Sequence, residues 1–233
     1  MSTLRAGGIS QPPFDDGQGG GGFNLATHVG DQITDVQENR HRLRALLPAE
    51  PAWLTQVHGT TVRDAGSVVA APEADASFTN QPNVVCVIMT ADCLPVLLCD
   101  RAGTVVGAAH AGWRGLADGV LQATVAAMQA AGANDLQAWL GPAIGPQQFE
   151  VGEEVRATFV ARDANTAAAF LPYPNRSGKF LADIYLLARL ALRDAGVSRI
   201  AGGDRCTVTE PTNFYSFRRD HRTGRMASLI WIE

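Results

Sequence analysis

The segment VVCVIMTADCLPVLLCDRAGTVVGAAHAGWRG, from Val84 to Gly115, contains three short apolar runs separated by turn-forming residues. The runs cover residues 84–90, 94–99 and 104–110. Short runs of β-branched residues bounded by Gly and Pro are typical of buried strands. The segment therefore predicts three consecutive strands, with Cys93 and His110 at strand ends, where side chains can face a cleft.

Helices are predicted on both sides of this segment from apolar residues at helical spacing, over residues 35–47, 116–131, 152–162 and 182–195. The first helix is preceded by Thr34-Asp35-Val36-Gln37, which has the form of a capping box. Gly132 and Gly196 follow two of the others, as glycines that end helices do.

Further strands are predicted over residues 52–57, 61–64, 136–140, 199–208 and 225–232. The first two would form a hairpin around the turn His58-Gly59-Thr60, while residues 1–33 are rich in glycine and are predicted to be a loop. Several strands follow one another directly, which favours α/β layers around mixed or antiparallel sheets over a strictly alternating doubly wound sheet. We expect one domain over residues 1–233.

Composition narrows the class of protein. The 233 residues are 46% hydrophobic and 18% charged, with a net charge of -4. This balance allows a sizeable core and offers no basic surface for nucleic acid or an anionic membrane. With no apolar run long enough to span a bilayer and no basic-then-apolar leader, we expect a cytoplasmic protein that acts on a small molecule. Four cysteines without C-x-x-C spacing are expected to be free thiols.

Three residues stand out as a candidate site, because His58, Cys93 and His110 each lie where a predicted strand ends in a turn. Two imidazoles and a thiolate suit zinc, and three protein ligands leave a coordination position for water or substrate, as in catalytic sites. A second hypothesis uses the same residues without metal, with Cys93 as a thiolate nucleophile and His110 as its base. Each residue could instead have a purely structural role.

Five blocks of sequence carry a resemblance to known proteins: Gln56–Gly59, Thr90–Val96, Ala109–Gly115, Ala138–Pro146 and Gly224–Trp231. Together they resemble the laccase-domain family, whose members were first called multicopper polyphenol oxidoreductases, then purine nucleoside phosphorylases and, in one bacterial branch, peptidoglycan editing factors. The resemblance extends from Arg5 to the C-terminus. It lapses over residues 14–23, where a glycine run replaces the family's short segment.

The resemblance implies that His58, Cys93 and His110 are zinc ligands at the heart of the active site. It implies a layered α/β/β/α sandwich similar to the catalytic domain of the cytotoxic necrotizing factor toxins. It further implies phosphorolysis of adenosine, inosine, guanosine and S-methyl-5′-thioadenosine, with adenosine deamination at the same site.

Residue counts argue against the older oxidase name. A blue multicopper oxidase needs about ten histidines for its copper centres, largely in H-x-H pairs. This chain has five histidines and no such pair. Polyphenol oxidation is therefore disfavoured, although Cu²⁺ could enter a His/Cys site adventitiously, since it outranks zinc in affinity.

The remaining chemistry needs an acid or base and an anion site. The H-x-E and P-C-x-x-C signatures of zinc deaminases are absent, so Asp92 and Glu150 are the candidates for the acid and base, each with a structural alternative. Arginine suits phosphate because its planar guanidinium can bind two oxygens at once. The candidate arginines are Arg40, Arg114, Arg218 and Arg219, the last two beside the aromatic residues 214–217, which could stack on a purine or form part of the core.

The sequence thus predicts a zinc-dependent purine nucleoside phosphorylase with adenosine deaminase activity. One alternative is a cysteine or zinc hydrolase that removes wrongly inserted L-serine from peptidoglycan precursors. Another is a metal-binding or redox-sensing protein without turnover. The sequence leaves the oligomeric state, the physiological substrate and the choice between phosphate and water as acceptor open.

Overall fold

The computed structural model describes residues 1–233 and consists of sheets covered by helices. Its helices are α1 (Ile33–Arg44), α2 (Trp113–Asp118), α3 (Val120–Ala130), α4 (Glu153–Arg162), α5 (Ile184–Asp194) and α6 (Phe217–Asp220). Two short 3₁₀ helices cover Ala65–Ser67 and Ala164–Ala169. None of the helices is long and apolar enough to cross a membrane.

The strands form three sheets. The largest has the order β12-β8-β6-β7-β4-β3, built from Arg199–Gly202, Leu136–Leu140, Leu94–Asp100, Val106–Ala111, Ala76–Thr79 and Val62–Asp64. A smaller sheet has the order β13-β5-β2, built from Met226–Ile230, Val85–Thr90 and Pro51–Ala52. The third, β10-β11-β9, is built from Phe170–Pro172, Lys179–Ala182 and Glu150–Gly152.

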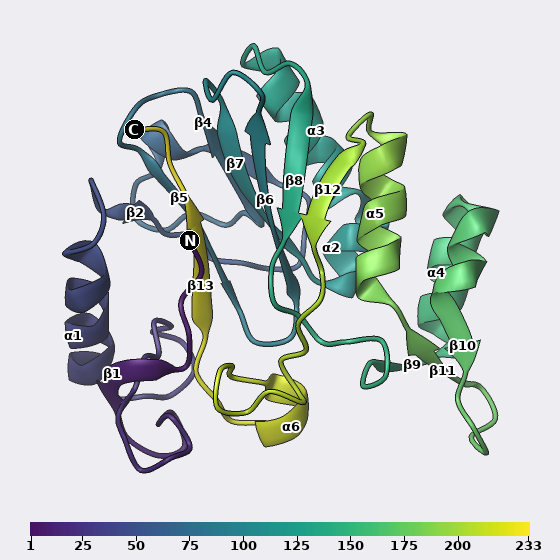
Figure 1. Ribbon diagram of the computed structural model, residues 1–233, viewed down its shortest axis with the longest axis horizontal. Helices are drawn as coiled ribbons and strands as arrows, with labels where there is room; N and C mark the ends of the chain where they lie inside the picture. The colour runs from purple at the N-terminus through teal and green to yellow at the C-terminus, as the bar shows by residue number, and fades with distance from the viewer.

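Alternation of side chains along β5 explains how the layers pack. Val85 and Val87 lie in one apolar cluster with Leu43 of α1. Their neighbours Cys86 and Ile88 point the other way, into a cluster shared with the larger sheet. Figure 1 shows α1 outside the smaller sheet and α3 and α5 outside the larger one. The layered α/β/β/α prediction is therefore confirmed.

The opposite face of the larger sheet carries the largest core. Val96 and Leu98 of β6 pack there with residues of α3 and α5, such as Leu121 and Leu187, in a cluster of 32 buried residues. Burying apolar area on this scale is the dominant favourable contribution to folding. The strands that carry Cys93 and His110 at their ends are consequently held in a rigid framework.

The three strands expected between residues 84 and 110 are confirmed as β5, β6 and β7. β5 belongs to the smaller sheet and β6 to the larger one, so the turn at residues 91–93 connects the two sheets. β6 and β7 pair antiparallel, with Pro95 opposite His110. This register brings the turn before β6 next to the end of β7.

Two helix predictions need correction. The helix expected over residues 116–131 is interrupted at Gly119, where a left-handed backbone (φ 100°) ends α2 and begins α3. The capping box at Thr34 is also wrong, because α1 already begins at Ile33 and its N-cap is Gln32. The Thr34 hydroxyl donates to Asp35 instead, and the helix ends at Arg44 rather than residue 47.

The hairpin expected around His58 is wrong. β2 covers only Pro51–Ala52 and pairs parallel with β5, while β3 pairs parallel with β4 in the other sheet. The residues between them cross from one sheet to the other, and His58 itself has a positive φ of 62°. The strand expected over residues 199–208 stops at Gly202, because Gly202 and Gly203 adopt positive φ angles of 74° and 81°.

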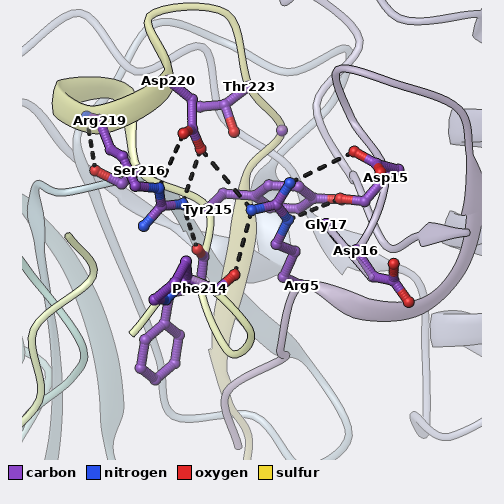
Figure 2. A network of polar contacts seen from close by, with 12 residues as sticks. Arg5, Asp15, Asp16, Gly17, Phe214, Tyr215, Ser216, Arg219, Asp220 and Thr223 are labelled. Carbon is purple, nitrogen blue, oxygen red and sulfur yellow. Dashed lines mark hydrogen bonds and ion pairs between the residues drawn. The ribbon is translucent and has the colours of Figure 1, made fainter. Parts of the chain in front are cut away.

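The N-terminal residues contain β1 (Ala6–Ser10), so the expected loop includes one strand. They are tied to the segment around α6 by the polar network in Figure 2. Arg5 donates to the carbonyl oxygens of Asp15 and Pro211 and lies near the carboxylate of Asp220. The buried Tyr215 hydroxyl donates to the carbonyl of Phe14. These contacts fix the short segment that carries Phe217 and Arg218.

Candidate functional site

His58, Cys93 and His110 converge from three different parts of the fold. Their candidate ligand atoms lie within 4.8 Å of one another, and the Cys93 Sγ is 3.7 Å from the His58 Nε2. The two imidazole rings meet edge to face, with centroids 4.8 Å apart. The β6/β7 register and the segment that crosses between the sheets at residue 58 thus bring together three side chains that are far apart in the sequence.

Asp75 organises this cluster, and sequence reasoning did not single it out. The side chain is fully buried, and its Oδ1 lies 2.8 Å from the His110 Nδ1. Both carboxylate oxygens also accept backbone N–H groups, from Val57, His58 and Gly59. Asp75 therefore fixes the His110 ring and the turn that carries His58. With Nδ1 bonded in this way, the Nε2 of His110 is left for a ligand.

The cluster favours a thiolate beside an imidazolium when no metal is bound. Burial would raise the pKa of Cys93, but the charge and hydrogen bonds of His110 and His58 outweigh it and lower this pKa to about 6. Burial would likewise lower the pKa of His110, but the Cys93 thiolate and Asp75 raise it to about 9. The thiolate is the form of cysteine that binds metals and acts as a nucleophile.

The donor set fits a metal ion. A tetrahedral zinc ion with bonds of ~2.0–2.3 Å separates its ligands by roughly 3.3–3.8 Å. The Cys93 Sγ and the His58 Nε2 are already at that spacing, and no pair of candidate ligand atoms is more than 4.8 Å apart, so each would need to move by about 1 Å or less. The carboxylate behind His110 is the outer-shell partner that metal-bound histidines commonly have. His58, Cys93 and His110 are therefore able to hold a metal ion.

The three side chains open into a cavity of about 300 Å³. Its walls come from β5 and β7, from the segments that follow β2 and precede β13 at one end of the smaller sheet, and from α6. A metal held by three side chains at such a wall keeps a position that faces the cavity, as catalytic sites require. The lining residues are His28, Gln56, His58, Met89, Thr90, Ala91, Cys93, His110, Phe217 and Arg225.

A second hollow of about 200 Å³ adjoins the first and shares Ala91, Cys93 and Phe217 with it. Its character is more apolar, since most of its other lining side chains are hydrophobic. Cys93 thus lies between a polar space and an apolar one. The remaining residues of the second hollow are Asp92, Trp113, Ile144, Phe149, Ile184 and Arg218.

Two of the arginines predicted for substrate binding lie outside both hollows. Arg40 lies 3.9 Å from the centre of the Trp53 ring and donates to the carbonyl of Leu25. Arg114 is exposed and lies over its neighbour Trp113. These contacts hold both arginines away from the cavity, although Arg114 is close to His110 in the sequence.

Asp92 and Arg218 lie at the second hollow but are engaged with the protein. The Asp92 carboxylate accepts the Thr207 hydroxyl and the Arg218 backbone N–H, both at 2.6 Å. These bonds join the turn before β6 to α6. The Arg218 side chain donates to the carbonyl of Glu150 and is otherwise exposed to solvent.

The other two candidates are held more firmly. Arg219 donates to three backbone carbonyls and pairs with Asp220, as Figure 2 shows in part. The Glu150 carboxylate pairs with Arg176. Both side chains therefore have structural partners, and neither lines the two hollows.

Three other lining residues were missed by the sequence reasoning. Gln56 bonds the backbone of Met89 with both its amide oxygen and its amide nitrogen, which holds the crossing segment against β5. His28 and Arg225 lie at the same cavity from the N-terminal and C-terminal ends of the chain. Arg225 immediately precedes β13, so the rule that selected the other strand-end residues could have found it.

The chain is similar to known proteins over its whole length. A family model described as "Multi-copper polyphenol oxidoreductase laccase" matches residues 1–233. The Escherichia coli (strain K12) protein named "Purine nucleoside phosphorylase YfiH" is 54% identical over 234 residues, covering 99% of this chain and 92% of that protein. A Pseudomonas aeruginosa protein named "Purine nucleoside phosphorylase PA4543" is 53% identical over 231 residues, again covering 99% and 92%.

Solved structures show the same fold. The crystal structure of Neisseria meningitidis protein NMB0706 superposes with a TM-score of 0.92 at 49% identity and covers 100% of this chain and 93% of its own. That of the Bacillus licheniformis protein YfiH superposes with a TM-score of 0.89 at 29% identity, covering 100% and 91%. The layered arrangement is therefore shared well beyond close sequence similarity.

Proposed function

This chain belongs to the multi-copper polyphenol oxidoreductase laccase family, and we propose that it is a zinc-dependent purine nucleoside phosphorylase with a secondary adenosine deaminase activity. The observation that carries the proposal is the convergence of His58, Cys93 and His110 at the wall of an open cavity. Relatives named purine nucleoside phosphorylase at 54% and 53% identity support an enzyme of the transferase type.

The ligand inventory supports zinc over the copper chemistry in the family's description. His58, Cys93 and His110 form one group able to hold one ion, and no second group of three such residues converges in the chain. A four-copper oxidase needs several adjoining histidine-rich sites. A bound zinc ion would supply Lewis-acid polarisation at the cavity wall. The chain's own residues supply the rest: Asp75 orients His110, and the cavity admits the substrate.

Phosphorolysis breaks the bond between C1′ of the ribose and the purine nitrogen and forms a bond from C1′ to a phosphate oxygen. The base leaves with the electron pair and takes up a proton. Charge develops on the sugar as the base departs, so positioned charged groups lower the barrier. The apolar hollow beside Cys93, lined by Trp113, Phe149 and Phe217, suits the flat purine ring. We propose adenosine, inosine, guanosine and S-methyl-5′-thioadenosine as substrates.

The proposal is tested with adenosine and purified protein, with and without inorganic phosphate. With phosphate we expect adenine and ribose 1-phosphate, and without it inosine as the main product of slower deamination. Loss of His110 should depress both reactions. The absence of phosphate-dependent base release from every purine nucleoside would reject the phosphorylase proposal.

A second candidate function rests on the contact between Cys93 and His58. A thiolate beside imidazoles is also the arrangement of a cysteine nucleophile, which supports a hydrolase that removes misincorporated L-serine from a peptidoglycan precursor. Its activity would survive chelators and be lost on alkylation of Cys93. Release of serine from a muramyl precursor, without phosphorolysis, would favour this hydrolase.

A further inference from the structure

Arg225 is a cation at the cavity that no carboxylate neutralises. It lines the cavity together with the three candidate metal ligands and takes part in none of the ion pairs of the chain. Most of its side chain is removed from solvent, which disfavours the charge. The negative charges of Cys93 and Asp92 offset this effect on the pKa of Arg225 only in part. A largely buried guanidinium that makes no ion pair favours binding an anion from outside.

The hydrogen bonds of Arg225 leave one edge of the guanidinium unused. Nη1 donates to the carbonyls of Thr223 and Gly224, which fixes the plane of the group. Nε and Nη2 have no hydrogen-bond partner in the protein. These two nitrogens form the parallel fork that binds two oxygens of a phosphate or carboxylate.

The backbone around Arg225 is held by the loop that also carries His28. The buried Asn24 accepts the Arg225 N–H at its side-chain oxygen, and the Leu25 N–H donates to the Arg225 carbonyl. The Asn24 amide donates to Ala26 and to Asp31, on either side of His28. His28 therefore comes to the same wall of the cavity with an imidazole that has no hydrogen-bond partner in the protein.

Anions that belong to the protein are already in use near Arg225. Asp92 accepts two hydrogen bonds from Thr207 and Arg218. Cys93 faces the two imidazoles and is one of the candidate metal ligands. Neither carboxylate nor thiolate thus competes for the free edge of Arg225.

We infer that the Nε and Nη2 edge of Arg225, supported by the His28 imidazole, is the subsite for inorganic phosphate in this cavity. The inference rests on the proposed phosphorylase function. It assigns to Arg225 the phosphate-binding role that was predicted from the sequence for Arg40, Arg114, Arg218 or Arg219. Two phosphate oxygens occupy the fork, which leaves the others free to face the sugar. The oxygen that attacks C1′ forms the new C–O bond as the C–N bond to the purine breaks and its electron pair leaves with the base.

The test compares the full-length protein with Arg225→Gln, which removes the charge, and Arg225→Lys, which keeps the charge and loses the fork. The KM for phosphate should rise roughly 30-fold or more in Arg225→Gln, because a desolvated charge pair is lost, and by less in Arg225→Lys. The KM for inosine should stay within about threefold of the original value, because the substitution weakens the phosphate subsite and leaves the nucleoside subsite unchanged. Arg63→Gln, an exposed arginine on β3 outside the cavity, is the matched control and should change neither constant.

Equilibrium dialysis with radioactive inorganic phosphate separates this inference from the proposed function. Arg225-dependent phosphate binding by a protein that releases no base would sustain the subsite and reject the phosphorylase. Base release with an unchanged phosphate KM in Arg225→Gln would sustain the phosphorylase and overturn the subsite. A rise confined to the nucleoside KM would also overturn it, since Arg225 would then bind the nucleoside. Thermal unfolding of each variant shows that the comparison is between folded proteins.

Discussion

Asp75 joins two of the three candidate ligands through a single buried carboxylate. One oxygen lies 2.8 Å from the His110 ring, and the pair of oxygens accepts three successive backbone N–H groups around His58. Four hydrogen bonds to one carboxylate favour its charged form. The pKa of Asp75 is accordingly lowered, although burial alone would raise it. Asp75 is not itself a candidate metal ligand, yet it fixes the positions of two residues that are.

Replacing this carboxylate should weaken metal binding. Asp75→Asn places an amide among donors, so at least one donor faces another and the His110 ring loses its fixed orientation. We expect the affinity for zinc to fall about 10- to 100-fold, as for other outer-shell partners. The matched control is Asp100→Asn, because Asp100 is also buried and accepts three hydrogen bonds from Thr104 and Val105. Asp100 lies at the end of the β6–β7 hairpin that is far from His110. Competition with a chromophoric chelator measures the zinc affinity of both variants. Equal affinities would contradict the role of Asp75 in orienting the metal ligands.

The thiolate of Cys93 should be essential for tight metal binding. Cys93→Ser offers a neutral hydroxyl in place of a thiolate, so we expect stoichiometric zinc to be lost from the purified protein. Cys99→Ser is the control, since Cys99 is also partly exposed but lies near Gln137, outside the cavity. Metal analysis by mass spectrometry makes the comparison. Full activity in an extensively chelated, metal-free sample would instead reject the zinc role.

At the scale of elements, the chain after β7 makes a close approach to the site. Gly112 is the N-cap of α2, and a Cβ built on it would lie 2.7 Å from the His58 ring and 3.1 Å from the Cys93 sulfur. Its own φ is -63°, so an alanine there would have no backbone strain. Glycine is required at this position only because a larger side chain would collide with His58 and Cys93.

Two glycines on this stretch therefore give opposite predictions. Gly112→Ala should displace His58 or Cys93 and lower zinc affinity by about tenfold or more. At Gly119 an added Cβ would make only an ordinary contact, 3.6 Å from the Gln122 side chain, but the backbone is left-handed, so Gly119→Ala should lower the free energy of unfolding by about 1–2 kcal/mol and leave zinc affinity unchanged. Urea unfolding and chelator competition on both variants make the test. A loss of affinity in Gly119→Ala alone would show that the contact at Gly112 is unimportant.

The segment that carries α6 depends on a contact with the other end of the chain. The Tyr215 hydroxyl, buried with its ring, donates to the Phe14 carbonyl, and Figure 2 places it beside Arg5. Tyr215→Phe leaves a buried carbonyl without this partner, so we expect a loss of about 1–3 kcal/mol in the free energy of unfolding. Tyr173→Phe, which removes a partly exposed hydroxyl without a hydrogen bond, should change it by less than about 0.5 kcal/mol. Similar losses in both variants would contradict the assigned role of the contact.

The sequence predicts the elements better than their connections. β5, β6 and β7 follow directly from apolar runs, because buried strands need little more than β-branched residues and boundaries. The hairpin at residue 58 was wrong because local turn signals do not tell which sheet a strand joins. The break at Gly119 was missed because a helix can tolerate an isolated glycine at a cost of ~1 kcal/mol, so the glycine alone does not predict a break.

The candidate site was predictable only where its residues end strands. Cys93 and His110 have that signature, whereas His58 was selected from a hairpin that the structure does not form, and the fold brings all three within 4.8 Å. Asp75 and Arg225 immediately precede β4 and β13, so the same rule could have found them. His28 reaches the site through a contact between distant segments, which no spacing in the chain predicts. Arg40 and Arg114 illustrate the converse, since proximity in sequence or a suitable charge did not bring them into the cavity.

At the scale of the whole molecule, the two stacked sheets place the site where their strand ends meet. The cavity takes residues from the N-terminal loop, from β5 and β7, and from the segment between α6 and β13, which Figure 1 shows at one end of the layers. Metal ligands, an apolar hollow and an unpaired arginine therefore adjoin one another. This combination supports the proposed reaction, in which a phosphate oxygen replaces the purine at C1′ of a nucleoside.

The most direct measurement follows the oxygen atoms of the acceptor. Inosine is incubated with phosphate that carries ¹⁸O at all four positions, and the sugar products are analysed by mass spectrometry. We predict ribose 1-phosphate that retains all four labelled oxygens, because the new bond joins C1′ to a phosphate oxygen, and no such product from Cys93→Ser. Free ribose carrying oxygen from the solvent, or no release of hypoxanthine at all, would contradict the proposed phosphorolysis.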